Sequence, residues 1–425
     1  MFSRTTRRVT SLRQLSLKSF NNASITVNLK DKTVSFDNVF LRDSCDSPDS
    51  VDASTRQKSF TTASITRNLE IAEPPKVVNE NGEQNLLVKW KQGNKIHESR
   101  YSEYFLQKSS SLKERFNGKF FPEEKVYWKK TDLVPNLSEL KVDYNDYFAK
   151  DNVFQKVVNN LNKYGLSFIE NVEDPQNDPK LGSIKPENEY LWPVAKLASR
   201  FGYIKKTFYG VLFDVKNEKN AKNIANTNVF LPLHMDLLYY ESPPGLQLLH
   251  FIQNTTLGGE NIFADSFAAA YSIRDRDPKA YEALKKVPIT YHYNNNNEYY
   301  YYMRPLVVED PYVKNFTTGE PQIKEVNYAP PFQGPFELNA TTAEDPKLWQ
   351  EFLRGLRLFE DFINDPQNQY EVKSPEGSCV IFDNRRVLHS RNQFSDSNGG
   401  DRWLMGTYVD GDSYRSKLRK VNETQ

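Results

Sequence analysis

The sequence predicts a mostly β protein with added helices, in which a double-stranded β-helix (jelly roll) with flanking helices follows a small β-rich N-terminal domain. Short apolar runs bounded by glycine or proline recur in the second half of the chain and indicate strands. Segments with 3.6-residue apolar spacing are few and stand beside those runs, which favours helices packed against a double sheet.

The first predicted domain covers residues 23–130. The segments 24–29 and 85–90 alternate apolar and polar side chains, which is typical of half-buried strands, and Gly82 and Gly93 supply turns. A linker is then expected to run through Pro135 to about residue 143. The larger domain is then expected to cover residues 144–425.

The second domain is predicted to begin with a helix that Asp151 caps and Gly165 ends. Its apolar side chains fall on one face: Phe154, Val157, Val158 and Leu161. A strand over residues 166–169 follows. Further helices are expected over residues 188–199 and from Asp345, which has proline in the first turn.

Strands are expected to dominate the rest of the second domain. The best candidates are short and apolar, namely residues 245–252, 261–264, 378–382 and 403–408. The asparagine- and tyrosine-rich stretch 294–302 is interpreted as a hairpin tip or a loop at a functional site.

Composition excludes several classes of protein. Its 425 residues suffice for two or three domains, and 38% hydrophobic with 13% aromatic residues exclude the disordered class for most of the chain. Fifty-six basic and 55 acidic residues nearly cancel, so no charge bias favours nucleic acid or an anionic membrane as partner. No apolar run has the length needed to span a bilayer. A homodimer is compatible with the sequence.

The N-terminus and the cysteines bear on localisation. The first 30 residues are basic, rich in serine and threonine, and free of acidic residues before Asp31. This composition is typical of a mitochondrial transit peptide, so residues 1–22 are predicted to be a transit segment and the protein to reside in the mitochondrial matrix. The alternative is a disordered basic N-terminus on a cytoplasmic protein. Cys45 and Cys379 lie far apart, which excludes a disulfide framework and favours a reducing compartment.

The segment His234-Met235-Asp236 is the candidate metal motif. Residues two apart on a strand point to the same face, so both side chains can reach one ion. The other four histidines are candidates for the third ligand. His389 is favoured because it ends an apolar strand and turn. Such a short motif also arises by chance, and the alternative for His389 is a structural histidine. His250 is expected to pack or to bridge strands.

Two histidines and one carboxylate hold Fe(II) on one face and leave the opposite face open. Arg402, at the start of a predicted strand beyond His389, can pair with a dicarboxylate in two-pronged fashion. The set predicts an oxygenase that uses Fe(II), 2-oxoglutarate, O2 and a small-molecule substrate. The alternative for Arg402 is a surface arginine at a strand end.

From about residue 41 onward the sequence resembles the γ-butyrobetaine dioxygenase family, within the clavaminate synthase and taurine dioxygenase-like superfamily. The segments that carry the resemblance are 207–210, 234–236, 244–250, 258–260, 382–389 and 406–410. The resemblance implies His234, Asp236 and His389 as iron ligands and Arg402 as the anchor of 2-oxoglutarate. It also implies that Asn261 lies near 2-oxoglutarate, where relatives carry a small hydroxyl residue.

The sequence departs from the family in its N-terminal domain. Relatives often hold a structural zinc ion with three cysteines and one histidine. Here Cys45 and His97 match two of these ligands, whereas Ser47 and Ser50 stand at the other two cysteine positions. One thiolate and one imidazole do not close a tetrahedral zinc site, so no structural zinc is expected.

The second departure concerns the substrate, whose trimethylammonium group relatives enclose with aromatic faces. Phe213 replaces a tryptophan of the family and Asn226 a tyrosine, while Tyr328 stands where an asparagine would be expected. The substrate-facing positions that the resemblance implies are Tyr209, Phe213, Asn223, Asn226, Tyr328 and Tyr408. We therefore expect hydroxylation of an aliphatic C–H in a compound such as γ-butyrobetaine, in carnitine biosynthesis. The alternatives are a trimethyllysine dioxygenase or a related oxygenase, and a non-catalytic mitochondrial protein that retains the fold.

Overall fold

The computed structural model describes residues 15–65, 69–80, 82–216, 224–295, 297–337 and 345–423. The chain divides into two compact units, Met1–Lys119 and Phe120–Gln425, and each is described by itself. Among the described residues, no helix has the length and apolar character required to cross a membrane.

The first unit contains two antiparallel three-stranded sheets, in the orders β1-β2-β3 and β4-β5-β6. Its strands are β1 (Ser16–Phe20), β2 (Ser24–Leu29), β3 (Lys32–Asp37), β4 (Glu70–Glu80), β5 (Glu83–Gln92) and β6 (Lys95–Ser102). Helices α1 (Asn38–Asp43) and α2 (Glu103–Lys108) accompany the sheets, and α3 (Leu112–Phe120) ends at the division. The core is apolar because alternate residues of β2 and β5, such as Val27 and Val88, point inward.

Both predicted boundaries of this unit differ from the structure. Residues 16–20 lie within the predicted transit segment 1–22, yet they form β1 and pair with β2. The second unit begins at residue 120 rather than 144, because Trp128 is fully buried in its core and β7 (Lys141–Asp143) pairs with β8. The polar, proline-containing segment around Pro135 resembled a linker because its few buried side chains are widely spaced.

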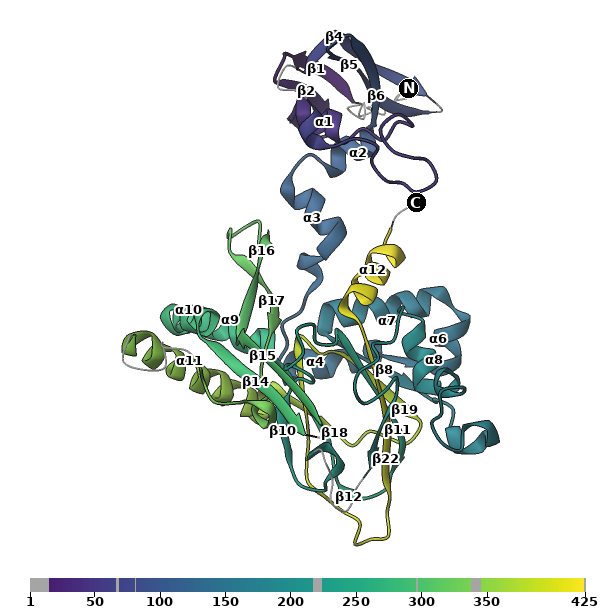
Figure 1. Cartoon of the computed structure of the whole chain (residues 1–425), viewed down its shortest axis with the longest axis vertical. Coiled ribbons are helices and arrows are strands. Elements are labelled where there is room, and N and C mark those ends of the chain that lie inside the picture. Colours follow the sequence, from purple (N-terminus) through teal and green to yellow (C-terminus); the bar gives the residue numbers. More distant parts are fainter. Residues whose placement is uncertain are drawn as a thin grey trace, which may run out of the picture. The chain divides into compact units, whose positions relative to one another are not determined.

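Two facing sheets form the centre of the second unit (Figure 1). The larger sheet has the order β7-β8-β19-β11-β22-β9. Its remaining strands are β8 (Leu166–Glu170), β19 (Ser378–Asp383), β11 (Leu246–Asn254), β22 (Arg402–Val409) and β9 (Phe213–Lys216). The smaller sheet, β10-β20-β13-β18, consists of β10 (Leu231–His234), β20 (Val387–Arg391), β13 (Asn261–Asp265) and β18 (Gln369–Val372).

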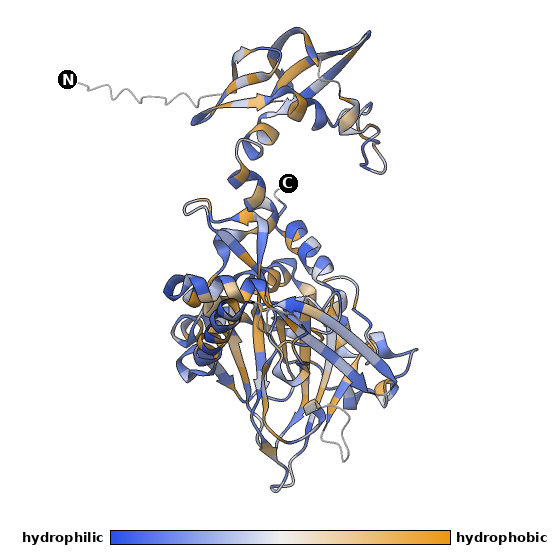
Figure 2. Cartoon of the chain, turned by 60° about the vertical axis from the view of Figure 1, so that its left-hand side comes forward, coloured by the Kyte–Doolittle hydropathy of each residue, from blue (hydrophilic) through white to orange (hydrophobic). Residues whose placement is uncertain are grey.

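Apolar side chains fill the space between the two sheets and cover their outer faces. Phe251 and Phe382 of the larger sheet meet Phe263 of the smaller sheet in one core cluster. Alternate residues of the larger sheet, such as Leu248, point outward to helices. Figure 2 shows hydrophobic residues concentrated on these strands. The arrangement is the double-sheet sandwich with flanking helices that the sequence predicts.

Helices cover both outer faces of the sandwich. Those beside the larger sheet are α6 (Tyr144–Ala149), α7 (Asp151–Tyr164), α8 (Pro193–Ser199) and α12 (Gly411–Val421). Those beside the smaller sheet are α9 (Ser266–Arg276), α10 (Pro278–Lys286) and α11 (Pro346–Asn364). The short helices α4 (Lys130–Leu133) and α5 (Leu137–Leu140) precede β7. Pairs of strands complete the unit: β12 (Leu257–Gly258) with β21 (Phe394–Ser395), β14 (Pro288–Asn295) with β15 (Glu298–Pro305), and β16 (Val307–Lys314) with β17 (Pro321–Val326).

Most predicted elements of the second unit are present, with shifted ends. Helix α7 ends where expected because Gly165 adopts a left-handed φ of +73°, and a Cβ there would lie 2.6 Å from Val387. The helix expected over residues 188–199 starts only at Pro193, which occupies its first turn. The asparagine- and tyrosine-rich stretch is the β14–β15 hairpin, with Asn296 outside the described residues.

Candidate metal centre

The strand register brings the two histidines of the motif together. Strands β10 and β20 are antiparallel neighbours, and His234 is the direct cross-strand partner of His389. Their ring centroids lie 4.2 Å apart. Strand β10 ends at His234, so Asp236 stands in the turn beyond it, where Leu237 has a φ of +60°. The sequence placed both residues on one strand, and the structure instead uses a turn to aim Asp236 at the histidines.

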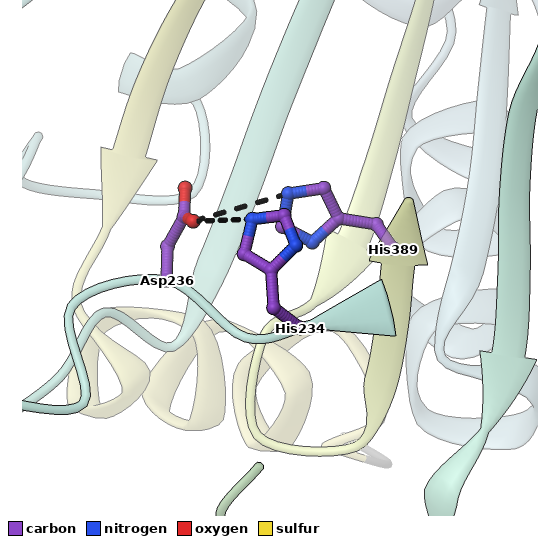
Figure 3. Close-up of side chains that lie close together, drawn as sticks. All are labelled: His234, Asp236 and His389. Carbon is purple, nitrogen blue, oxygen red and sulfur yellow. Dashed lines mark ion pairs between the residues drawn. The ribbon is translucent and has the colours of Figure 1, made fainter. Parts of the chain in front are cut away.

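The three side chains point toward a common centre (Figure 3). Asp236 Oδ1 lies 3.2 Å from His234 Nε2 and 3.9 Å from His389 Nε2. All three donor atoms lie within 4.8 Å of one another. An ion that binds each donor at about 2 Å requires donors separated by roughly 3 Å. The arrangement therefore fits one metal ion, with only small adjustments of the side chains.

The three groups are held in the protonation states that bind metal. His234 Nδ1 lies 2.8 Å from the carbonyl of Pro232, which fixes the proton on Nδ1 and leaves Nε2 free to coordinate. Burial lowers the pKa of His389 to about 3, so its imidazole is neutral. Burial alone would raise the pKa of Asp236, but its polar surroundings, including the hydrogen bond from the Tyr408 hydroxyl, lower it below its ordinary value. Neutral imidazoles and an ionised carboxylate are the forms that coordinate Fe(II).

Two buried residues hold Asp236 in place. The Asp236 N–H donates to Asn384 Oδ1 at 2.9 Å, and Asn384 Nδ2 donates to the Asp236 carbonyl at 3.0 Å. The Tyr408 hydroxyl donates to Asp236 Oδ2 at 2.7 Å, which leaves Oδ1 for the metal. Neither supporting role was evident from the sequence, although Asn384 lies within the segment that precedes His389.

Arg402 and Asn261 line one cavity together with the three predicted ligands. Arg402 is buried, no acidic partner pairs with it among the described residues, and its Nε has no hydrogen-bond partner. Burial, with the nearby Arg391, lowers its pKa to about 9. An unpaired buried cation is costly, so this end of the cavity is suited to a carboxylate. Asn261 Oδ1 is likewise buried without a partner.

A second, adjoining cavity shares His234 and Asp236 and has aromatic walls. The substrate residues proposed from the sequence that line it are Tyr209, Phe213, Asn226 and Tyr408. Asn223 lies outside the described residues. Two further aromatic residues, Tyr239 and Phe332, line the same cavity and were missed. The apolar run after the motif pointed to Tyr239, whereas nothing in the sequence linked Phe332 to the site.

The structure does not bring Tyr328 into this cavity. Its hydroxyl donates to Glu360 on α11 at 3.0 Å, and its ring packs against Phe359 at 5.2 Å between centroids. Only its backbone reaches the motif, because its carbonyl accepts from the Met235 N–H at 2.9 Å. Its position two residues beyond β17 turns the side chain toward the helical layer, so the substrate role expected for Tyr328 is not supported.

The remaining candidate residues do not belong to the converging set of donors. His250 is buried in β11, and neither ring nitrogen has a hydrogen-bond partner in the described part of the chain, so the side chain packs without bridging strands. In the first unit, His97 Nε2 lies 3.3 Å from Cys45 Sγ and 3.3 Å from Ser50 Oγ. Ser47 Oγ lies 3.3 Å from Cys45 Sγ, which completes a hydrogen-bonded cluster.

The two-sheet sandwich and its converging donors define a metal-dependent oxygenase of the two-histidine, one-carboxylate type. The model of the taurine catabolism dioxygenase TauD, TfdA family matches residues 129–408. This match spans more than half of the chain and includes every predicted metal ligand, and the chain belongs to that family.

Curated relatives match over nearly the whole chain. Dioxygenase str8 of Strobilurus tenacellus is 35% identical over 390 residues, which cover 90% of this chain and 84% of the relative. Gamma-butyrobetaine dioxygenase of Pseudomonas sp. (strain AK-1) is 29% identical over 401 residues, covering 93% of both chains. The mitochondrial trimethyllysine dioxygenase of Mus musculus is 26% identical over 388 residues, covering 90% of this chain and 82% of the relative.

Proposed function

We propose that the protein is an Fe(II)- and 2-oxoglutarate-dependent dioxygenase that hydroxylates an aliphatic C–H of a small trimethylammonium compound such as γ-butyrobetaine. One observation carries the proposal: the three donors, an unpaired buried arginine and an aromatic cavity adjoin one another. Carnitine biosynthesis is the process that such an activity serves.

His234, Asp236 and His389 would hold the iron, which supplies the oxygen chemistry that couples 2-oxoglutarate decarboxylation to hydroxylation. Arg402 would bind the distal carboxylate of 2-oxoglutarate with two donors. Asn384 and Tyr408 keep the Asp236 carboxylate oriented. Apolar residues around the cavity, such as Leu249 and Leu404, exclude water from the reacting atoms.

The difference in charge between the two cavities supports a substrate that carries a quaternary ammonium group. Arg391 and Arg402 line the cavity assigned to 2-oxoglutarate. The adjoining cavity has no lysine or arginine among its described lining residues, and five of them are aromatic: Tyr209, Phe213, Tyr239, Phe332 and Tyr408. Aromatic faces attract a quaternary ammonium through their quadrupole, and tetraalkyl cations need no hydrogen bonds.

Localisation in the mitochondrial matrix is part of the proposal. The basic, acid-free first 30 residues are typical of a transit peptide, and the Mus musculus relative is described as mitochondrial. Because β1 begins at Ser16, cleavage before residue 15 would leave the first sheet complete. Amino-terminal sequencing of the protein from purified mitochondria tests this directly. A cytoplasmic protein that retains Met1 would contradict it.

A trimethyllysine dioxygenase is the second candidate, because the Mus musculus relative matches over 90% of this chain. Both activities need the same metal centre and a site for a trimethylammonium group, so the site does not separate them. A non-catalytic protein is disfavoured, since Arg402 is buried with no acidic partner among the residues that the structure describes, and this would be costly without an anion to bind.

Succinate formation by the iron-reconstituted protein with a substrate panel tests the proposal. The panel contains γ-butyrobetaine, trimethyllysine and taurine, with the His389→Ala variant as control. We expect γ-butyrobetaine to stimulate turnover most, and preference for trimethyllysine would select the second candidate. Stimulation by neither, with iron bound, would exclude the carnitine assignment but retain the oxygenase. No conversion of 2-oxoglutarate under any condition would favour the non-catalytic alternative.

A further inference from the structure

Gly406 lies within β22, directly opposite Phe213 of the neighbouring strand β9. A Cβ at Gly406 would lie 2.2 Å from Phe213 Cζ, 2.3 Å from Cε2 and 2.9 Å from Cε1. The Phe213 ring therefore lies against bare backbone, in the space that any other residue would fill. Glycine inside a strand lowers its stability and often marks such a close approach.

The position of this ring shapes both cavities. Phe213 lines the aromatic cavity and the cavity that contains Arg402. Its ring stacks on Tyr408, with centroids 4.9 Å apart and planes inclined by 25°, and Tyr209 lies 6.0 Å away. The ring thus forms a wall beside Asp236, whose carboxylate Tyr408 holds.

The backbone around Gly406 has little freedom to accommodate a side chain. Strand β22 pairs with β9 on one side and with β11 on the other, where Leu249 is the partner of Gly406. Both pairings hold the strand in place, so an added methyl group must displace the Phe213 ring. The distance from the new Cβ to Phe213 Cζ would have to grow from 2.2 Å to at least 3.4 Å, the lower limit of ordinary van der Waals contact. Strand β22 blocks one side of the ring and the ring already lines both cavities, so we expect it to move into the cavity.

We propose that Gly406 is a specificity-determining residue, which sets the width of the substrate cavity by letting Phe213 lie flat on β22. The choice of γ-butyrobetaine as substrate rests on the proposed function. The contact between Gly406 and Phe213 is independent of that function. Gly406 contacts neither iron nor 2-oxoglutarate in this scheme. It acts through Phe213, so its substitution changes substrate binding while the metal centre remains intact.

A double-mutant cycle in the full-length, iron-loaded protein tests this, with γ-butyrobetaine as probe. Gly406→Ala is expected to raise the KM for γ-butyrobetaine about 10–100-fold, the range for one methyl group in a tight pocket. The KM for 2-oxoglutarate should rise by a smaller factor, because the side chains proposed to hold it, Arg402 and the three metal ligands, are unchanged. In a Phe213→Ala background, where no ring remains to displace, Gly406→Ala should change the KM for γ-butyrobetaine less than about twofold. Equal effects in both backgrounds would overturn the proposal.

Gly355→Ala is the matched control. A Cβ at Gly355 would lie 2.9 Å from Leu284 in the contact between α10 and α11, so the variant is also overpacked but away from both cavities. It should lose stability without raising the KM for γ-butyrobetaine. A comparable rise in that KM would show that general destabilisation explains the effect of Gly406→Ala.

A crystal structure of Gly406→Ala gives a second test that needs no substrate. The Phe213 ring should be displaced toward the metal centre, with β9 and β22 in their original register. Rotation of the ring away from the cavity, or a shift of β9 as a whole, would refute the inference. If γ-butyrobetaine does not stimulate the wild-type protein, the proposed substrate fails, and this structure alone decides the role of Gly406.

Discussion

Replacement of Asn384 by alanine is expected to weaken both metal binding and the fold. The side chain is fully buried and makes three hydrogen bonds, accepting from the Asp236 N–H at 2.9 Å and donating to the carbonyls of Asp236 at 3.0 Å and Pro244 at 3.3 Å. Each such bond contributes about 0.5–1.5 kcal/mol, so the variant should lose about 2–4 kcal/mol of unfolding free energy. Loss of a group that orients a metal ligand typically lowers metal affinity about 10–100-fold.

Asn188→Ala separates the two effects. Asn188 is also buried, accepts from the Lys185 N–H at 2.9 Å, and donates to the carbonyls of Lys180 at 3.1 Å and Ser183 at 2.9 Å. The Asn188→Ala variant should lose a similar unfolding free energy but bind the metal with unchanged affinity. Urea denaturation measures stability, and anaerobic titration with Mn(II) measures affinity. Equal Mn(II) affinity in the two variants would refute the role assigned to Asn384.

Three further predictions concern other buried groups. Arg402→Leu should abolish the stabilisation that 2-oxoglutarate gives the metal-loaded protein. The same variant should raise the melting temperature of the apoprotein, because it removes a buried cation that has no acidic partner among the described residues. A less stable apoprotein would contradict this. Burial lowers the pKa of His250 from 6.5 to about 4, so the unfolded chain takes up this proton first as the pH falls and the folded state loses stability between those values. Between pH 7.5 and 5 the wild type should lose about 2 kcal/mol more than His250→Leu in urea denaturation, and parallel losses would refute the assignment. Cys45 and His97 are hydrogen-bonded to serines in place of further thiolates, so elemental analysis should find no stoichiometric zinc, and one zinc ion per chain would disprove the prediction.

The convergence of His234, Asp236 and His389 was predictable because local and long-range signals agreed. His234 and Asp236 are close in the sequence, and few other histidines were available to complete the set. The apolar segment before His389 predicted a strand, and the β10–β20 register then brings the histidines together. Arg402 could be found because a strand start beyond the last ligand places a guanidinium beside it.

Contacts between distant segments were not predictable. Phe332 reaches the aromatic cavity from a short turn far from every motif, and the Tyr328 side chain turns instead to Glu360 on α11. Both outcomes depend on how the helical layer packs against the smaller sheet, which periodicity does not specify. The start of the second unit was misplaced for a similar reason, since Trp128 is buried through long-range contacts with Asp265 and Tyr164.

In the proposed site, His234, Asp236 and His389 bind one Fe(II), to which 2-oxoglutarate is added beside Arg402. Anaerobic titration of the apoprotein with Fe(II) and 2-oxoglutarate tests it most directly, because the chelate gives a weak visible charge-transfer band. We predict that the band saturates at one iron per chain and is absent in His389→Ala. Folded wild-type protein that binds no iron, or that gives no band with both components present, would contradict the assignment.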